Sequence, residues 1–406
     1  MPRVEVWIAG FPSRYGGADT ELDHQIDLLR RFDVDVHLVP MTSTDDAMME
    51  SVVARGCHVH PYRNDVFAGR TVLSWCNGTF LDRLPRIMHA GRPARVVWFN
   101  CMTWLFDRER DAHARGWIDV FGFVSRYQRD LLMPELTRIG PVRTFDYRPF
   151  FNLDRVESEY RPWGGSYQVG RISRDDPAKF APDTWHIFDA IRVPRELAKR
   201  VVVVGLGADA TTRIGPPPPA LDVEIWPPDT LPADCFFAEV DTLVHKTGGS
   251  RESYCRAVIE AYAHAVVPVV EADYAFPELI MHGETGFMAR TSGEMIDYAS
   301  MLAHEPALHR RIARQGREHL ANLSRPERCW AGWNQILRSG ESRHAERDRV
   351  ARRRSQTGVE VLAVDDLHIP LVATGLDAQR GPADSDALDG EREAESWPLR
   401  IGDVLG

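Results

Sequence analysis

Several features that define familiar protein classes are missing from this 406-residue sequence. It has no Cys-x-x-Cys pair, and its six cysteines, at positions 57, 76, 101, 235, 255 and 329, match neither a zinc site nor a disulfide framework. We therefore expect reduced thiols and a cytoplasmic protein. No run of about 18 apolar residues occurs. No membrane-spanning helix is expected, and any membrane contact should be peripheral.

An excess of positive charge is also absent. The formal net charge is −10, so no overall positive field would attract a polyanion, and nucleic acid is not an expected partner. The first residues, 4–9, resemble a core strand and not the charged and apolar regions of a signal peptide. Hydrophobic residues make up 44% of the chain, which is enough to bury a globular core.

Short runs rich in Val, Ile and Trp alternate with segments of helical period. This alternation is typical of an α/β fold with parallel sheets. Asp19 is a candidate N-cap for the helix that follows the first strand. The expected strands are residues 4–10, 34–40, 71–75, 95–99, 119–124, 167–172, 201–205, 223–226, 242–245 and 266–270, and the clearest later helices are 184–191, 253–264 and 307–321.

The alternation stops in a segment rich in proline, glycine and aromatic residues, 147–165, and then restarts. One hydrophobic core rarely organises more than roughly 250–300 residues. We therefore predict two Rossmann-like domains facing across a cleft, residues 1–155 and 156–325. A helix over 326–340 should cross back to the first domain, and residues 341–406, with a basic and then an acidic stretch, should form a flexible tail.

The segment 247–261 lies between two predicted strands and carries the strongest chemical signal. Its Gly-Gly loop enters a predicted helix, whose free backbone N–H groups could hold an anion or sugar hydroxyls. Glu252 and Glu260 are eight residues apart, which on one helix corresponds to about 12 Å of rise and about 80° of rotation. Both carboxylates could then face one elongated ligand.

Several motifs in this order resemble one enzyme family. Glu252 and Glu260 match the E-x7-E signature of retaining GT-B glycosyltransferases of sequence family four, also called group 1. The similarity continues in Pro277-Glu278-Leu279-Ile280 and in the Gly-Glu-Thr-Gly-Phe run at 283–287. Upstream it includes Gly170-Arg171-Ile172-Ser173-Arg174 with Lys179, and Tyr15-Gly16-Gly17-Ala18-Asp19 after the first strand.

The resemblance implies transfer of a sugar from a nucleotide diphosphate sugar with retention of anomeric configuration. Charge that develops on the departing diphosphate needs fixed positive groups. Arg171 and Lys179 are the predicted catalytic cations, with Arg174 as a substitute, and Glu252 is the predicted catalytic acidic residue. Glycines at 16 and 17 would let backbone N–H groups approach phosphate.

The remaining donor contacts are also implied by the resemblance. Glu260 should bind the ribose hydroxyls, and the backbone at Ser253, Tyr254 and Cys255 should hold the sugar. The family often places a histidine after the fourth or fifth strand of the first domain, where this chain has Asn100. Candidates on the acceptor side are Asn100, Ser125 and Tyr127. The acceptor would be a glycan, a lipid-linked molecule or a small molecule.

Two alternatives remain open. Residues 205–210, Gly-Leu-Gly-Ala-Asp-Ala, satisfy a dinucleotide fingerprint, with Glu224 near the place of a ribose-binding acid, as in an NAD(P)-dependent oxidoreductase. Four prolines at 216–219 argue against a helix after these glycines. A phosphorylase or epimerase relative of the same fold is the second alternative. The histidines show no metal-ligand spacing, so no metal, and no cofactor besides the donor, is expected.

Overall fold

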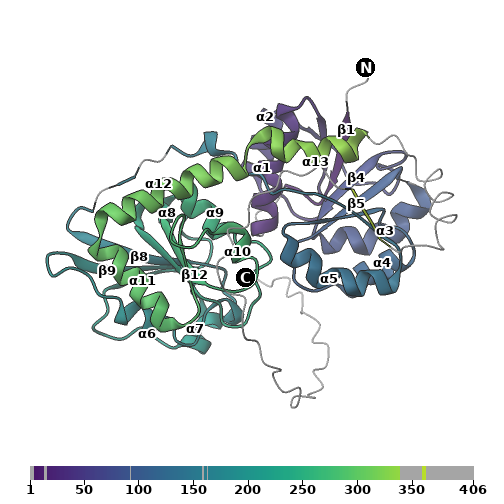
Figure 1. The fold of residues 1–406 in the computed structure, drawn as a ribbon. Coiled ribbons are helices and arrows are strands. Elements are labelled where there is room, and N and C mark those ends of the chain that lie inside the picture. Colours follow the sequence, from purple (N-terminus) through teal and green to yellow (C-terminus); the bar gives the residue numbers. More distant parts are fainter. Residues whose placement is uncertain are drawn as a thin grey trace, which may run out of the picture. The chain divides into compact units, whose positions relative to one another are not determined.

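The computed structural model describes residues 4–12, 16–91, 93–157, 160–161, 163–338 and 359–362. All of them fall within one compact unit, Met1–Val364. They form two parallel β-sheets with helices on both faces (Figure 1), which confirms the predicted α/β class with two Rossmann-like sheets. Most of the predicted 341–406 tail, and Tyr15 of the glycine motif, lie outside the described residues.

The first sheet has the strand order β14-β7-β6-β5-β4-β1-β2-β3. The order reverses between β1 and β4, and such a reversal is where parallel sheets place ligands. Residues 359–362 of the predicted tail form its last strand, parallel to β7. The bounds are β1 Glu5–Ala9, β2 Asp35–Val39, β3 His58–Val59, β4 Thr71–Trp75, β5 Arg95–Asn100, β6 Val120–Phe123, β7 Val142–Phe145 and β14 Val359–Leu362.

The second sheet has the strand order β10-β9-β8-β11-β12-β13, and its direction of progression reverses between β8 and β11. The loops after these two strands are therefore the expected ligand-binding loops. The bounds are β8 Ser166–Ile172, β9 Ala198–Val204, β10 Val223–Trp226, β11 Thr242–His245, β12 Val267–Glu271 and β13 Phe287–Ala289.

Fifteen helical segments surround the two sheets in the described part of the chain. Two predicted helix starts were wrong: the first helix begins at Gly17, so Asp19 lies in its first turn, and the helix predicted from residue 253 begins at Arg256. The bounds are α1 Gly17–Arg31, α2 Asp46–Ala54, α3 Gly78–Ala90, α4 Asp107–Ala114, α5 Arg126–Ile139, η1 Leu153–Arg155, η2 Pro177–Lys179, α6 Thr184–Ala190, α7 Ala208–Ile214, α8 Ala233–Glu239, α9 Arg256–Ala263, α10 Phe276–Leu279, α11 Ser292–His304, α12 Pro306–Leu323 and α13 Pro326–Arg338.

Each sheet is buried on both faces because its strands carry apolar residues at nearly every position. In β1, Val6 and Ile8 join one core cluster, and Trp7 and Ala9 join the cluster on the opposite face. Successive side chains of a strand point to opposite faces, so a continuous apolar run serves both clusters. The carboxyl ends of the strands are thereby held at one rigid edge.

The C-terminal helix α13 packs into the core of the first sheet. Trp333 is 1% exposed and donates from its indole nitrogen to Gln25 Oε1 at 2.9 Å. Trp330 stacks on Phe32 with ring centroids 4.6 Å apart. These contacts tie the segment after the second sheet to α1 of the first.

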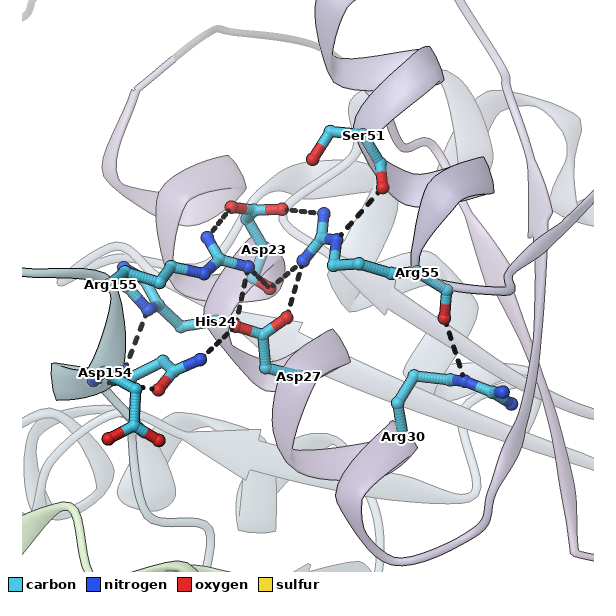
Figure 2. A network of polar contacts seen from close by, with 9 residues as sticks. Asp23, His24, Asp27, Arg30, Ser51, Arg55, Asp154 and Arg155 are labelled. Atoms are coloured by element: carbon cyan, nitrogen blue, oxygen red, sulfur yellow. Dashed lines mark hydrogen bonds and ion pairs between the residues drawn. The ribbon is translucent and has the colours of Figure 1, made fainter.

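An alternating network of charges fixes the segment that connects the two sheets (Figure 2). Asp23 and Asp27 of α1 each pair with two arginines, Arg55 at the end of α2 and Arg155 in η1. The Asp27 contacts are 2.8 Å to Arg55 and 2.6 Å to Arg155. Because each carboxylate serves both guanidinium groups, the connecting segment is anchored on α1 by a network and not by one surface pair.

Three buried histidines make the stability sensitive to acid. Burial lowers the pKa of His24 to about 2, with Arg256 adding to the effect, and it lowers the pKa values of His245 and His309 to about 4. Below pH 6.5 these three histidines therefore bind protons in the unfolded chain but stay neutral in the folded chain. Each histidine should remove about 1.4 kcal/mol of unfolding free energy per pH unit as the pH falls from 6.5 toward 4.

A variant comparison isolates this effect, because burial raises the pKa of Glu109 to about 7 and of Asp241 to about 6, which acts in the opposite direction. We expect the urea-unfolding free energy of His24→Gln to fall less steeply between pH 6.5 and 4.5 than that of the unsubstituted protein, by about 1.4 kcal/mol per pH unit. His304→Gln, at an exposed position, serves as control. Equal slopes for all three proteins would contradict the assignment.

Candidate functional site

The candidate site lies where the order of the second sheet reverses. Strand β8 ends at Ile172 and β11 ends at His245, and the loops that follow them carry Lys179 and Glu252. These two residues are 73 positions apart in sequence, yet Lys179 Nζ lies 2.8 Å from Glu252 Oε1. The fold therefore brings together two of the three predicted catalytic side chains in direct contact.

Glu252 is held on one side only. Its side chain is 10% exposed, and Oε1 contacts both Lys179 and His245 Nε2, the latter at 3.4 Å. Within the described part of the chain, no hydrogen-bond donor reaches Oε2. One carboxylate oxygen is thus fixed by the protein, and the other has no donor among the described residues.

The charge state of this cluster follows from its surroundings. Burial alone would raise the pKa of Glu252, but the hydrogen bond from His245 and the charge of Lys179 outweigh it and lower the pKa to about 2. Burial, and then the charge of Arg171, lowers the pKa of His245 to about 4. At neutral pH the site contains an ionised Glu252 and a neutral His245.

Arg171 takes a different position from the one predicted. It is 1% exposed, its guanidinium donates to the backbone carbonyl of Lys179, and it lies over the Phe180 ring with its central carbon 4.9 Å from the ring centroid. Burial lowers its pKa to about 10, so it remains charged. Arg171 therefore anchors the η2 segment that carries Lys179. Its buried positive charge also interacts with the carboxylate of Glu252.

Arg174 is the exposed cation of this loop. Its Cδ lies 3.7 Å from the point that a Cβ on Gly16 would occupy. Gly16 itself has φ of 123°, in the region that favours glycine, and precedes the first residue of α1. Gly17 lies close to α9, since a Cβ added to it would lie 3.3 Å from Arg256 Cγ. The structure thus brings the glycine pair, the start of α1 and Arg174 together.

The residues after Glu252 connect the two sheets and are not helical. Ser253 Oγ donates to the Cys101 carbonyl at 2.7 Å, and Ser125 Oγ donates to the Ser253 carbonyl at 2.5 Å. Cys255 is 4% exposed, and Tyr254 packs against core residues of both sheets. The helical geometry used to relate Glu252 to Glu260 therefore does not apply.

Glu260 lies within α9, one turn after Arg256. Its side chain is 16% exposed, and Arg256 Nε is 3.8 Å from its Oε1. Burial raises the pKa of Glu260, partly offset by the positive charge of Arg256. The second glutamate of the motif is thus a separate group from the Glu252 cluster.

Of the predicted acceptor-side residues, Asn100 is fully buried, whereas Ser125 and Tyr127 lie at the start of α5. Asn100 is 0% exposed, and its amide oxygen and nitrogen both serve neighbouring groups, so its surroundings do not favour a ligand contact. Ser125 caps α5 by accepting from the Gln128 backbone at 3.1 Å. The Tyr127 backbone N–H donates to Glu278 Oε1 at 2.6 Å.

Two useful residues were not predicted as site residues. Glu278, in the predicted Pro277–Ile280 motif and in α10, caps the start of α5 by accepting from the backbone of Arg126 and Tyr127. His245 was considered only as a metal ligand. His245 could have been predicted as a site residue because it is the last residue of a predicted strand, and parallel sheets bind ligands at the carboxyl ends of their strands.

The dinucleotide fingerprint has an unexpected structure. A helix does follow its glycines, contrary to the sequence argument, although α7 is only seven residues long. Asp175 occupies the start of that helix, with Oδ1 accepting from the Ala210 backbone at 2.8 Å and Oδ2 from Asp209 at 3.3 Å. A carboxylate at this place repels a phosphate. The loop also follows β9, which is one strand away from the point of reversal.

Two other features concern possible metal and membrane contacts. Among the described residues, no group of three His, Cys, Asp or Glu side chains is placed to hold a metal ion. None of the described helices combines the length and the apolar character needed to cross a bilayer.

Comparisons with known proteins agree with this architecture. No protein-family model and no curated protein sequence matches the chain. Among solved structures, HepE from Anabaena in complex with UDP and glucose is 14% identical, with 83% of this chain and 100% of that chain covered and a TM-score of 0.60. A TarM variant from S. aureus, in complex with fondaparinux, alpha-GlcNAc-glycerol and UDP, is 11% identical, with 84% and 100% covered and a TM-score of 0.63.

A glycosyltransferase from Rickettsia africae is similar as well, at 10% identity, with 84% of this chain and 100% of that chain covered and a TM-score of 0.61. Identities of this size carry information on the fold alone. The two parallel sheets, their strand order and these likenesses together show that this chain has the GT-B fold.

Proposed function

We propose that this protein is a glycosyltransferase that moves a sugar from a nucleoside diphosphate sugar to an acceptor with retention of anomeric configuration, as in sequence family four. The observation that supports it most strongly is the contact between Lys179 and Glu252 at the reversal point of the second sheet. It joins a phosphate-binding cation to a carboxylate with one oxygen left for a sugar hydroxyl.

In this proposal the donor extends from the Glu252 loop toward the start of α1. Glu252 Oε2 accepts from a hydroxyl of the sugar, and Glu260 binds the ribose. Lys179 and the exposed Arg174 bind the pyrophosphate, together with backbone N–H groups at Gly16 and Gly17. Arg171 positions Lys179 and does not contact the donor itself, because its guanidinium donates to the Lys179 carbonyl.

The chemistry follows from this arrangement. Breaking the bond between the sugar and the diphosphate places negative charge on the leaving group, and preorganised cations stabilise that charge where water is excluded. An acceptor hydroxyl attacks the face from which the diphosphate departs and gives its proton to the departing diphosphate oxygen, so retention requires no protein nucleophile. We propose that transfer needs no metal ion, and that the protein acts in the cytoplasm, which fits its six free cysteines.

A thermal-shift screen tests donor binding. UDP-glucose is the first ligand to try, followed by other UDP, GDP, ADP and TDP sugars. A donor at about 100 times its dissociation constant should stabilise the protein by roughly 2.7 kcal/mol. The shift should persist in EDTA. A shift that EDTA abolishes would contradict metal-independent binding, and no shift with any nucleotide sugar would contradict the proposed function.

The same screen separates the alternatives. Stabilisation by NAD(P) alone would favour an oxidoreductase, although Asp175 at the start of α7 opposes phosphate binding there. If a nucleotide sugar binds, product analysis distinguishes transfer from the other reactions of this fold. Release of a sugar phosphate would indicate a phosphorylase, and conversion of the donor into its epimer would indicate an epimerase.

A further inference from the structure

The loop between β5 and α4, residues 101–106, is held by a network of fully buried polar side chains. Asn100, Glu109 and Gln128 are each 0% exposed. Asn100 Nδ2 donates to the Trp104 carbonyl at 2.9 Å, and its Oδ1 accepts from the Met102 backbone at 2.6 Å. This single side chain thus fixes the loop at two points.

The other two members of the network complete the support. Gln128 Nε2 donates to the Met102 carbonyl at 2.8 Å, and Glu109 Oε2 accepts from the Phe106 backbone at 3.2 Å. Glu109 also accepts from Asn100 Nδ2 at 2.8 Å. Burying polar groups is unfavourable unless every group is bonded, and a fully bonded network selects one conformation. The loop is therefore preorganised.

This rigid loop displays an apolar side chain to solvent. Trp104 is 50% exposed, and its ring meets Phe106 edge-on with centroids 6.4 Å apart. Tryptophan carries one of the largest apolar surfaces of any side chain, so leaving half of it in water forgoes stabilisation. A scattered exposed apolar residue needs no explanation, but here three buried polar residues hold the segment that exposes it.

The loop that carries Trp104 is hydrogen-bonded to the segment that follows Glu252. The Cys101 carbonyl, at the start of the loop, accepts from Ser253 Oγ at 2.7 Å, and Ser253 adjoins Glu252. Trp104 follows Cys101 by three residues, so their α-carbons are at most about 11 Å apart. The loop that displays the ring is thus attached beside the predicted sugar end of the donor.

We propose that Trp104 is the acceptor-binding platform and that the acceptor is a carbohydrate, whose pyranose ring stacks its C–H face on the indole. The inference rests on the proposed glycosyltransferase function. An indole offers a flat apolar face with a polar edge, which matches a sugar ring. A membrane surface fits less well, because the nearby Asp107 side chain is 98% exposed and the chain has a net charge of −10.

Saturation-transfer NMR on the full chain tests this assignment, with the nucleoside diphosphate of whichever donor stabilises the protein present. The probes are methyl glycopyranosides of glucose, galactose, mannose and N-acetylglucosamine. We expect transfer to the ring C–H protons of at least one probe, about tenfold weaker binding in Trp104→Ala, and substantial recovery in Trp104→Phe. Val53→Ala, which alters another exposed apolar residue, should bind like the unsubstituted protein.

Two further measurements keep the inference separate from the function beneath it. The thermal shift of each variant with the nucleotide sugar that stabilises the unsubstituted protein reports on folding and the donor site, and the absence of a shift with every nucleotide sugar would count against the proposed function itself. With that shift present, equal glycoside binding by Trp104→Ala, or no glycoside binding at all, would overturn the platform. Loss of pelleting with phosphatidylglycerol vesicles in Trp104→Ala, with glycoside binding unchanged, would instead assign the ring to a membrane.

Discussion

Replacing Glu252 by glutamine is expected to lower the rate of sugar transfer by about 10²- to 10³-fold, while the protein remains folded. Glutamine has nearly the same shape, and an amide oxygen can still face His245. The substitution removes the charge that pairs with Lys179 at 2.8 Å and that strengthens the hydrogen bond from a sugar hydroxyl. The measurement is donor turnover with whichever nucleotide sugar stabilises the protein.

The position of the Glu252 charge leads to a second prediction, which concerns nucleotide binding with and without the sugar. UDP without a sugar should bind Glu252→Gln at least as tightly as the unsubstituted protein, because Lys179 is no longer neutralised, whereas the gain from the attached sugar should be lost. Glu318→Gln is the matched control, since that side chain is 66% exposed on α12. Undiminished turnover, or equal losses for UDP and for the UDP sugar, would remove Glu252 from the sugar-binding role.

Most strands were predictable because a strand that is buried on both faces of a sheet has a continuous run of apolar residues in the sequence. All ten predicted strands are present, from β1 with its Val6 and Ile8 to β12. Four short strands, β3, β7, β13 and β14, were not predicted. Arg143 interrupts the apolar run of β7, and β13 has only three residues and pairs with β12 alone. Such strands are defined by a neighbouring strand and not by their own composition.

The start of α9 could not be read from local sequence. Residues 252–255 contain no helix breaker, and helical spacing predicted a helix from Ser253. The structure uses Ser253 differently, with its hydroxyl bonded to Cys101 and its carbonyl to Ser125, more than 120 residues away. Contacts of that range override the weak local preference for a helix.

The site residues show the same division. The order of motifs predicted that Lys179 and Glu252 belong together, and the structure places them in contact. The order of motifs could not show that Arg171 would be 1% exposed and bonded to the Lys179 carbonyl, because an arginine at the end of a strand can point to solvent or inward. The sequence thus identified groups that gather at the reversal point, and packing determined which of them are buried.

Replacing Glu21 by alanine is expected to lower the unfolding free energy by about 3–5 kcal/mol, the largest loss of stability we predict for one substitution. Glu21 and Arg256 form an ion pair at 2.7 Å, with side chains 3% and 10% exposed. Glu21 also accepts from the Tyr147 hydroxyl at 2.7 Å and from the Phe150 backbone at 3.2 Å. Gln25 Nε2 is a further donor to this carboxylate at 2.9 Å, so the removal of Glu21 takes an acceptor away from four donors.

The pair connects α1 beside the first sheet to α9 beside the second, and in the described part of the chain the other carboxylate near Arg256 is Glu260, whose Oε1 lies at the longer distance of 3.8 Å from Arg256 Nε. Its Nε and Nη2 are buried without a hydrogen-bond partner, so Glu21→Ala strands a buried charge. The double variant Glu21→Ala, Arg256→Met should therefore be more stable than Glu21→Ala alone, because it removes that charge. Urea unfolding at pH 7 measures both, with Glu318→Ala of the exposed Arg314 pair as a control expected to cost less than about 1 kcal/mol. A Glu21→Ala loss no larger than the control's, or a double variant weaker than the single one, would show that Glu21 does not stabilise the fold by compensating the charge of Arg256.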